Sequence, residues 1–254
     1  MLKIVNCKNE AGVGAVAANE IAEVIRNKLD AVIGLATGSS PLTTYAELIN
    51  KYKNGEISFE KVTSINLDEY AGLSADHEQS YSHFMHKNLF NHVNINEKNV
   101  NIPNGLASDY EAECKRYDAV IKEAGGVDVQ LLGIGQNGHI GFNEPSDHFP
   151  VGTSLVELTD STIDANSRFF TSRDLVPTMA ISMGIGDIMA AKKIVMVVIG
   201  KEKAEIMESA FFGRVTPAVP ASILQFFKGD MMVCADEEAL SLIKKKHPEA
   251  VYKI

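Results

Sequence analysis

Short apolar runs alternate with longer segments of helical periodicity along the whole chain. The runs are typical of strands and fall at 2–6, 31–36, 61–67, 127–134, 193–200 and 231–235. Apolar residues from Tyr45 to Tyr52 recur at the i, i+3, i+4, i+7 spacing of one helix face. Similar segments predict one helix ending near Lys28, others at 81–90, 109–124 and 201–211, and one at the end of the chain.

Strand and helix patterns alternate from end to end, which predicts an α/β fold with a mostly parallel central sheet flanked by helices. The nearly continuous apolar run 127–134 is typical of a strand buried on both faces of such a sheet. No linker-like or repetitive segment interrupts the pattern, so we expect a single domain over residues 1–254. Ligands bind at the carboxyl ends of strands in such sheets, and three unusual loops, 36–41, 66–73 and 133–145, follow predicted strands.

Composition narrows the classes of function. The chain has 254 residues and a formal net charge of −9, and an acidic protein is a poor general binder of nucleic acid or anionic membranes. Cys7, Cys114 and Cys234 are scattered, which favours reduced thiols and a cytoplasmic location. We expect no signal peptide or membrane-spanning segment. His83 and His86 have no further metal ligands nearby in the sequence, so no metal site is expected.

The loop 36–41 leads from a strand into a helix. Exposed backbone N–H groups at a helix start, aided by the helix dipole, suit a phosphate. Thr37, Ser39 and Ser40 add hydroxyl donors beside Gly38. Helix capping is the alternative explanation, because Ser before Pro is a common helix start.

Asp68 and Glu69 follow the predicted strand 61–67. Adjacent residues of an extended chain point in opposite directions, so at most one of the two faces a given pocket. A carboxylate at a strand end, beside apolar walls, can have a pKa suited to proton transfer. A solvated turn is the alternative for such a pair.

His139 lies in a glycine-rich loop in which Gly133, Gly135 and Gly138 allow sharp bends and close approach to a ligand. The G-x-G-x-x-G spacing is that of dinucleotide-binding loops, but HIGFNEP lacks the small residues of such a helix start. His139 can exchange a proton near neutral pH, and Glu144 could orient it. A structural histidine in a tight loop is the alternative.

Two cations follow in the second half of the chain. Arg168 lies in the polar–aromatic stretch NSRFF, and Lys203 begins the helix after the strand 193–200. One bidentate Arg with one Lys is a combination that suits phosphate. Each could instead be an ordinary surface charge.

Taken together, these stretches resemble one family, the glucosamine-6-phosphate deaminases. The chain contains, in the order of that family, LATGSSPLTTY, NLDEYAGL, QSYSHFMHKNLF, LGIGQNGHIGFNEP, NSRFF and GKEKA. The resemblance covers nearly the whole chain and implies a modified Rossmann-like fold. It implies conversion of glucosamine 6-phosphate and water to fructose 6-phosphate and ammonia in amino-sugar catabolism, without a metal or organic cofactor.

The resemblance also implies a role for each candidate residue. Asp68 would move the proton between carbons 2 and 1 of the opened sugar, while His139, supported by Glu144, would open the ring. Asn137 stands where some members carry Asp, so it can orient His139 by hydrogen bonding but cannot supply charge. The substrate phosphate would be held by Thr37, Gly38, Ser39, Ser40, Arg168 and Lys203, with Arg168 in a mobile lid around 158–180.

The segment after FNEP departs from the regulated members of the family. Those members bind an activating N-acetylated sugar phosphate between subunits through a basic segment, whereas residues 146–158 here contain no Lys or Arg. A second anionic sugar bound there would lack its cations, so we expect no such activation. A homo-oligomer stays possible, and the sequence does not separate glucosamine from galactosamine 6-phosphate as the substrate.

Two alternatives share the implied fold. A 6-phosphogluconolactonase would be expected to have a motif similar to Asp-Glu-Arg at positions 68–70 and the sequence SLFP in place of FNEP. A sugar-phosphate-sensing domain of a transcription regulator would keep the phosphate loop but lose the catalytic groups. The presence of Asp68, His139 and Glu144 together favours the enzyme.

Overall fold

An eight-stranded sheet forms the centre of the molecule, and its neighbouring strands are all parallel. The computed structural model describes residues 1–253. In spatial order the strands are β11 (Val251–Lys253), β1 (Leu2–Asn6), β10 (Asp230–Ala235), β9 (Lys193–Val198), β6 (Val129–Leu132), β2 (Val32–Leu35), β3 (Thr63–Asn66) and β5 (Val100–Asn101). The predicted α/β fold with a mostly parallel sheet is confirmed.

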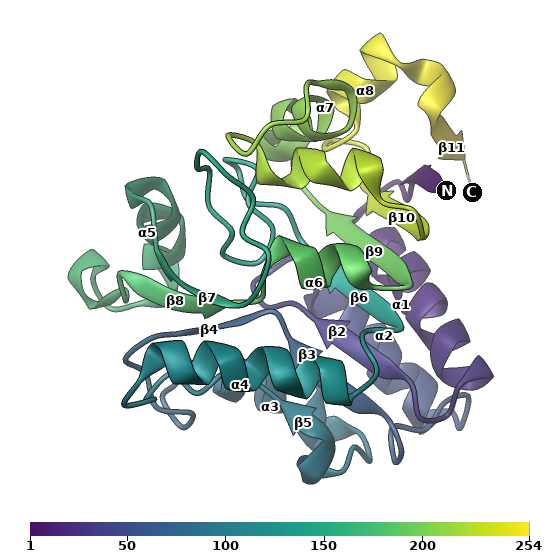
Figure 1. The fold of residues 1–254 in the computed structure, drawn as a ribbon. Coiled ribbons are helices and arrows are strands. Elements are labelled where there is room, and N and C mark those ends of the chain that lie inside the picture. The colour runs from purple at the N-terminus through teal and green to yellow at the C-terminus, as the bar shows by residue number, and fades with distance from the viewer. Residues whose placement is uncertain (254) are drawn as a thin grey trace.

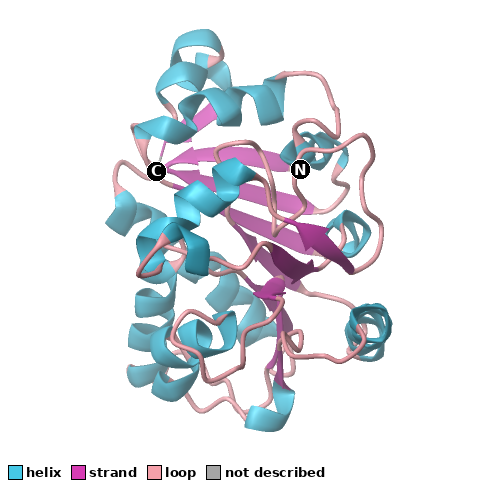
Figure 2. Cartoon of the chain, turned by 90° about the vertical axis from the view of Figure 1, so that its left-hand side faces the viewer, coloured by secondary structure: helices cyan, strands magenta, loops and turns pink. Residues whose placement is uncertain are grey.

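Helices cover both faces of this sheet, as Figure 2 shows from the side. In Figure 1, α1 (Glu10–Asn27) and α2 (Leu42–Lys53) lie behind the sheet and α6 (Ile185–Ala190) lies in front of it. The other helices are α3 (Tyr81–Asn88), α4 (Tyr110–Glu123), α5 (Asp160–Asn166), α7 (Ala204–Phe212) and α8 (Ser241–Lys246).

The local sequence explains why α1 forms and how it packs. The Asn9 side chain caps the helix by accepting a hydrogen bond from the Gly12 N–H. Val13, Ala17 and Ile21 fall on one face and are buried, because apolar residues at this spacing form a single stripe. The helix therefore contributes this face to the apolar core that runs through the whole molecule and makes it one domain.

β6 occupies the middle of the sheet, between β9 and β2. All four of its residues are buried, including the polar Gln130. This agrees with the prediction from the continuous apolar run, because a central parallel strand is covered by helices on both faces. The strand delivers the glycine-rich loop to the carboxyl edge of the sheet.

A second, three-stranded antiparallel sheet was not expected from the sequence. Its order is β4 (Asp68–Tyr70), β8 (Met179–Ser182) and β7 (Ser154–Glu157). The chain leaves the main sheet at Leu67, whose carbonyl accepts a hydrogen bond of 2.7 Å from the Met183 N–H. The alternative of a solvated turn at Asp68 and Glu69 is therefore wrong, because both residues are paired in a strand and buried.

The segment predicted as a lid connects β7 to β8 and contains α5. Its ends are joined where the Leu158 N–H donates to the Thr178 carbonyl at 2.8 Å. The segment packs on a small apolar cluster, separate from the main core, that includes Tyr70, Phe142 and Ile163. In Figure 1 it lies at the left, beside the main sheet. Its mobility stays a prediction.

Over residues 1–253, no helix is both long enough and apolar enough to cross a membrane. The same residues contain no group of three or more His, Cys, Asp or Glu side chains that could hold a metal ion. His86, one of the two histidines noted in the sequence, contacts the Ser82 carbonyl and the Glu97 carboxylate within and beside α3.

Candidate active site

A cavity of about 830 Å³ opens at the carboxyl edge of the main sheet. Four adjacent strands, in the order β9, β6, β2 and β3, each send a loop into its wall. Parallel strands end at the same edge of a sheet, so segments far apart in sequence meet here. The predicted site residues that line the cavity are Thr37, Gly38, Ser39, Ser40, Asp68, Asn137, His139, Arg168 and Lys203. Glu144 lies behind this wall, in contact with Asn137 and His139.

Asp68 and Glu69 face opposite sides of β4, as the sequence predicts for neighbours on a strand. Asp68 lines the main cavity. Glu69 faces a separate cavity of about 250 Å³ and accepts three backbone N–H bonds, from Tyr70 and Tyr81 at 2.8 Å and from Ser82 at 2.9 Å. Glu69 therefore holds the start of α3, and Asp68 is the carboxyl group available to a ligand.

Burial makes Asp68 a strong proton acceptor. Loss of solvent raises the pKa of Asp68 to about 8, with a smaller contribution from the charge of Glu69. Burial likewise raises the pKa of Glu69 to about 7, although its three backbone hydrogen bonds act in the opposite direction. A carboxyl group with such a pKa can take up a proton near neutral pH and return it.

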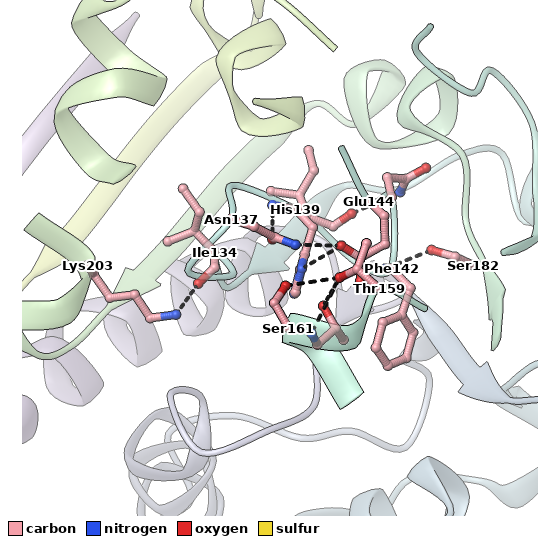
Figure 3. Close-up of polar contacts among 12 residues, drawn as sticks. Ile134, Asn137, His139, Phe142, Glu144, Thr159, Ser161, Ser182 and Lys203 are labelled. Carbon is pink, nitrogen blue, oxygen red and sulfur yellow. Dashed lines mark hydrogen bonds and ion pairs between the residues drawn. The ribbon is translucent and has the colours of Figure 1, made fainter. Parts of the chain in front are cut away.

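His139, Glu144 and Asn137 form one hydrogen-bonded group, shown in Figure 3. Nδ1 of His139 lies 3.5 Å from Oε2 of Glu144, a distance typical of an ion pair. The Asn137 Nδ2 donates to the same oxygen at 2.7 Å, and its Oδ1 accepts from the backbone N–H of His139 at 3.2 Å. Asn137 thus orients the carboxylate and the backbone of His139 rather than the imidazole ring directly.

The surroundings of Glu144 stabilise its charged form. Burial alone would raise the pKa of Glu144, but the interaction with His139, the nearby Thr162 hydroxyl and the hydrogen bond from Asn137 outweigh it and hold the pKa below its ordinary value. Glu144 is consequently a carboxylate at neutral pH. It places a negative charge beside the His139 ring.

The structure shows why two positions of this loop require glycine. The His139 ring packs directly over Gly135, where a Cβ atom would overlap the ring carbons and nitrogens. Gly138 has a φ of 89°, in the left-handed region that favours glycine. That these glycines allow close approach to a ligand stays a prediction; Gly135, which lines the cavity, also makes room for the histidine.

The loop between β2 and α2 brings three hydroxyl-bearing residues, Thr37, Ser39 and Ser40, to the cavity wall. α2 begins at Leu42 and no side chain caps it, so the alternative that Ser39 and Ser40 cap the helix is wrong. Gly38 has a φ of 94°, which turns the chain tightly at this point. The loop contacts the segment 158–180 through Ser39, whose Oγ accepts a hydrogen bond of 3.4 Å from Arg168.

Arg168 and Lys203 bring two positive charges to the same end of the cavity. Lys203 donates to the Ile134 carbonyl at 2.7 Å. Burial lowers the pKa of Lys203; the nearby Arg168 lowers it further, against the effect of Glu202. Within the part of the chain that the structure describes, neither cation forms an ion pair with a carboxylate. Two cations that form no ion pair, beside the hydroxyl groups of residues 37–40, form a site suited to an anion such as phosphate.

The sequence analysis did not single out two residues of the cavity wall. Tyr81 begins α3 and stacks on Phe142, with ring centroids 5.8 Å apart. Thr162 lies on α5, near Glu144. Tyr81 lies in the stretch QSYSHFMH, which contributed to the family resemblance, but no spacing rule indicates that its ring faces Phe142. The proximity of Thr162 and Glu144 depends on two segments that are distant in sequence.

Comparison with known proteins places the chain in a family. A family model described as glucosamine-6-phosphate isomerases/6-phosphogluconolactonase matches residues 9–233. The chain belongs to this family of sugar-phosphate enzymes. It is 51% identical over 243 residues to a glucosamine-6-phosphate deaminase of Clostridium perfringens, an alignment that covers 96% of this chain and 100% of that protein.

Solved structures agree with this assignment. The chain matches a monomeric glucosamine-6-phosphate deaminase with a TM-score of 0.92 and 43% identity, over 94% of this chain and 99% of that one. It also matches the 6-phosphogluconolactonase from Trypanosoma cruzi with a TM-score of 0.75 and 20% identity, over 95% and 96% of the two chains. At that identity the second likeness shows the fold alone.

Replacement of Asp68 by Asn should stabilise the protein at neutral and alkaline pH. The pKa of Asp68 rises from an ordinary 3.8 to about 8 on folding, so the native state binds more protons than the unfolded state between these values. The free energy of unfolding of the wild type must therefore fall as pH rises through this window. Asp68→Asn has no carboxyl group at this position and so lacks this loss of stability. Urea denaturation of both proteins from acidic to alkaline pH measures the difference.

The exposed Asp76 provides the control, with Asp76→Asn prepared in parallel. We expect the Asp68→Asn stability gain to grow with pH and the Asp76→Asn change to stay small throughout. A gain at Asp68 that is the same at all pH values would contradict the raised pKa.

Proposed function

We propose that the protein converts glucosamine 6-phosphate and water to fructose 6-phosphate and ammonia. One observation carries the proposal: a single cavity is lined by the buried carboxyl group of Asp68, by His139 with Glu144 behind it, and by the cations Arg168 and Lys203. These are the groups that proton transfer on a sugar phosphate requires. The similarity to curated glucosamine-6-phosphate deaminases over 96% of the chain supports the choice of substrate.

The phosphate end of the substrate binds first in this scheme. Arg168 and Lys203 supply the charge, and the loop from Thr37 to Ser40 supplies hydroxyl and backbone N–H donors. Arg168 arrives from the segment 158–180, which we propose is a mobile lid. Its packing on an apolar cluster separate from the main core and the 3.4 Å contact between Arg168 and Ser39 support this role.

Ring opening is the first chemical step. His139 takes the proton of the anomeric hydroxyl group and returns a proton to the ring oxygen, which breaks the bond between carbon 1 and that oxygen. Glu144 stabilises the imidazolium form during the transfer, and Asn137 fixes the carboxylate in place. The product of this step is the open-chain aldehyde of the amino sugar.

Isomerisation and deamination follow at carbons 1 and 2. Asp68 removes the proton from carbon 2 while one proton of the substrate ammonium group passes to the carbonyl oxygen, giving an enolamine; Asp68 then returns its proton to carbon 1, which leaves an iminium group at carbon 2. Water adds to this carbon, and ammonia leaves to give the ketone. The ammonium group of the substrate beside Asp68 favours the ionised carboxylate, which offsets the burial that raises its pKa to about 8.

We propose that the protein works as a monomer in the cytoplasm, without activation by an N-acetylated sugar phosphate. The solved structure with a TM-score of 0.92 is described as that of a monomeric glucosamine-6-phosphate deaminase. The segment 146–158 also contains no Lys or Arg with which to bind a second sugar phosphate.

An ammonia-release assay tests the reaction. Wild-type protein should release ammonia from glucosamine 6-phosphate, and Asp68→Asn should lower the rate by about 10²–10⁴-fold, the usual contribution of a general base. Galactosamine 6-phosphate is assayed alongside to define the sugar preference. Ammonia from neither sugar, lactone hydrolysis with 6-phosphogluconolactone, or an undiminished Asp68→Asn rate would contradict the proposal.

Removal of the Arg168 side chain tests the phosphate site. Arg168→Ala should raise KM about tenfold or more, because a hydrogen bond between charged groups contributes roughly 1.5–3 kcal/mol. Competitive inhibition by inorganic phosphate should weaken in parallel. The control is Arg214→Ala at an exposed arginine. This substitution should leave KM and the inhibition constant for inorganic phosphate unchanged. Equal effects of the two substitutions would argue against a local phosphate contact.

Kinetics with an added effector test the absence of activation. Initial rates against glucosamine 6-phosphate should follow a hyperbola with and without N-acetylglucosamine 6-phosphate, and light scattering should give the mass of one chain, 27.6 kDa. Sigmoidal rates that become hyperbolic with the effector, or a stable oligomer, would overturn this part of the proposal.

A further inference from the structure

We propose that Glu69 is a positioning residue that fixes the aromatic part of the wall of the active-site cavity. Glu69 lies on β4 next to Asp68 but faces the other side of the strand, and its side chain is buried. It does not line the main cavity, so its effect on the reaction passes through the groups that bond to it. The inference rests on the function proposed above for Asp68 and His139.

The Glu69 carboxylate caps the start of α3. A helix leaves its first N–H groups without partners inside the helix. The N–H groups of Tyr81 and Ser82 donate to Glu69 at 2.8 and 2.9 Å. The next one, that of His83, donates to Oγ of Ser80 at 3.0 Å. A charged acceptor at this end of a helix forms strong hydrogen bonds and interacts favourably with the helix dipole, so Glu69 sets the position of α3 relative to β4.

One oxygen of Glu69 holds the backbones of two tyrosines. Its Oε1 accepts the Tyr70 N–H and the Tyr81 N–H, both at 2.8 Å. The two rings contact each other with centroids 4.8 Å apart. Tyr81 also stacks on Phe142 at 5.8 Å, and Tyr70 meets Phe170 edge to face at 5.9 Å. This aromatic cluster joins four segments, which are β4, α3, the glycine-rich loop and the predicted lid.

The aromatic cluster lies where β4 meets the glycine-rich loop. Tyr81 and Phe142 both line the main cavity. The Phe142 N–H donates to Oγ of Ser182 at 3.0 Å (Figure 3), and Ser182 pairs with Asp68 across the antiparallel sheet. The neighbouring Gly141 approaches Asp68 so closely that an added Cβ atom would lie 3.5 Å from its Oδ2. A shift of Tyr81 would therefore reach, through Phe142, the part of the loop beside Asp68.

Misplacement of these groups should slow the chemistry more than it weakens binding. General acid–base groups must lie within hydrogen-bond reach of the proton that they transfer, and a displacement of about 1 Å can lower a rate by about 10²-fold. The three N–H groups that bond to Glu69 lie outside the predicted phosphate site. Loss of the Glu69 carboxylate should therefore lower kcat and leave KM little changed.

Two variants of the full-length protein separate positioning from charge. Glu69→Gln keeps the length of the side chain, but its amide nitrogen cannot accept a hydrogen bond. Glu69→Asp keeps the charge and is one methylene group shorter, so its carboxylate cannot reach the same N–H groups together. Each should lower kcat about tenfold, the order expected for a lost hydrogen bond to a charged group, with KM little changed. Wild-type kcat in Glu69→Asp would show that the charge alone matters and would overturn the positioning role.

Glu97→Gln is the matched control. Glu97 lines the same small cavity as Glu69, but it is exposed and contacts the His86 side chain rather than the backbone at the start of α3. The kcat and KM of this variant should equal those of the wild type. A kcat as low as that of the Glu69 variants would assign the effect to the small cavity in general and would overturn the inference.

Near-ultraviolet circular dichroism separates this inference from the proposed reaction. The chain has seven tyrosines and no tryptophan, so this signal reports chiefly on tyrosine rings held in fixed positions. It should weaken in both Glu69 variants, with the far-ultraviolet spectrum unchanged, and should stay as in the wild type in Glu97→Gln. Unchanged tyrosine signals in the Glu69 variants, or weakened signals with wild-type kcat, would overturn the inference. Absence of ammonia release by the wild type would instead overturn the proposed function, and the spectra would still decide whether Glu69 positions the tyrosines.

Discussion

The alignment of four parallel strand ends is the constraint on which the candidate site depends. β9, β6, β2 and β3 are neighbours in the main sheet, so the loops that follow them reach one cavity although they are spread over about two thirds of the chain. The backbone hydrogen bonds of the sheet fix this alignment, and helix packing on both faces holds it. A shift of one strand along its neighbour would move a cation or a carboxylate out of reach of the same ligand.

The electrostatics of the cavity differ from those of the whole protein. The chain is acidic, with a net charge of −9, yet Arg168 and Lys203 place two positive charges in the wall of the cavity. At Asp68, burial raises the pKa to about 8, whereas the donors around Glu144 hold the pKa of that carboxylate below its ordinary value. The pKa values of two buried carboxyl groups at this site are thus shifted in opposite directions, which suits them to the two different roles proposed for them.

Local patterns predicted much of this arrangement. The apolar runs identified the six longer or more central strands of the main sheet, and the strand-to-loop transitions identified the segments that carry Asp68, His139 and Lys203. The opposite directions of Asp68 and Glu69 also followed from strand geometry. Two details were not decided by these patterns: the capping alternative for the serines before Pro41 is excluded by the structure, and Gly135 makes room for the His139 ring.

The sequence by itself determined the fold class and the chemical groups at the strand ends, because apolar periodicity and strand-end loops are local properties. The tertiary structure alone decided the antiparallel sheet that buries Asp68, the stacking of Tyr81 on Phe142, and the approach of Thr162 to Glu144. Each of these depends on contacts between segments distant in sequence. Burial, and with it the pKa of a carboxyl group, is set by everything packed around that group.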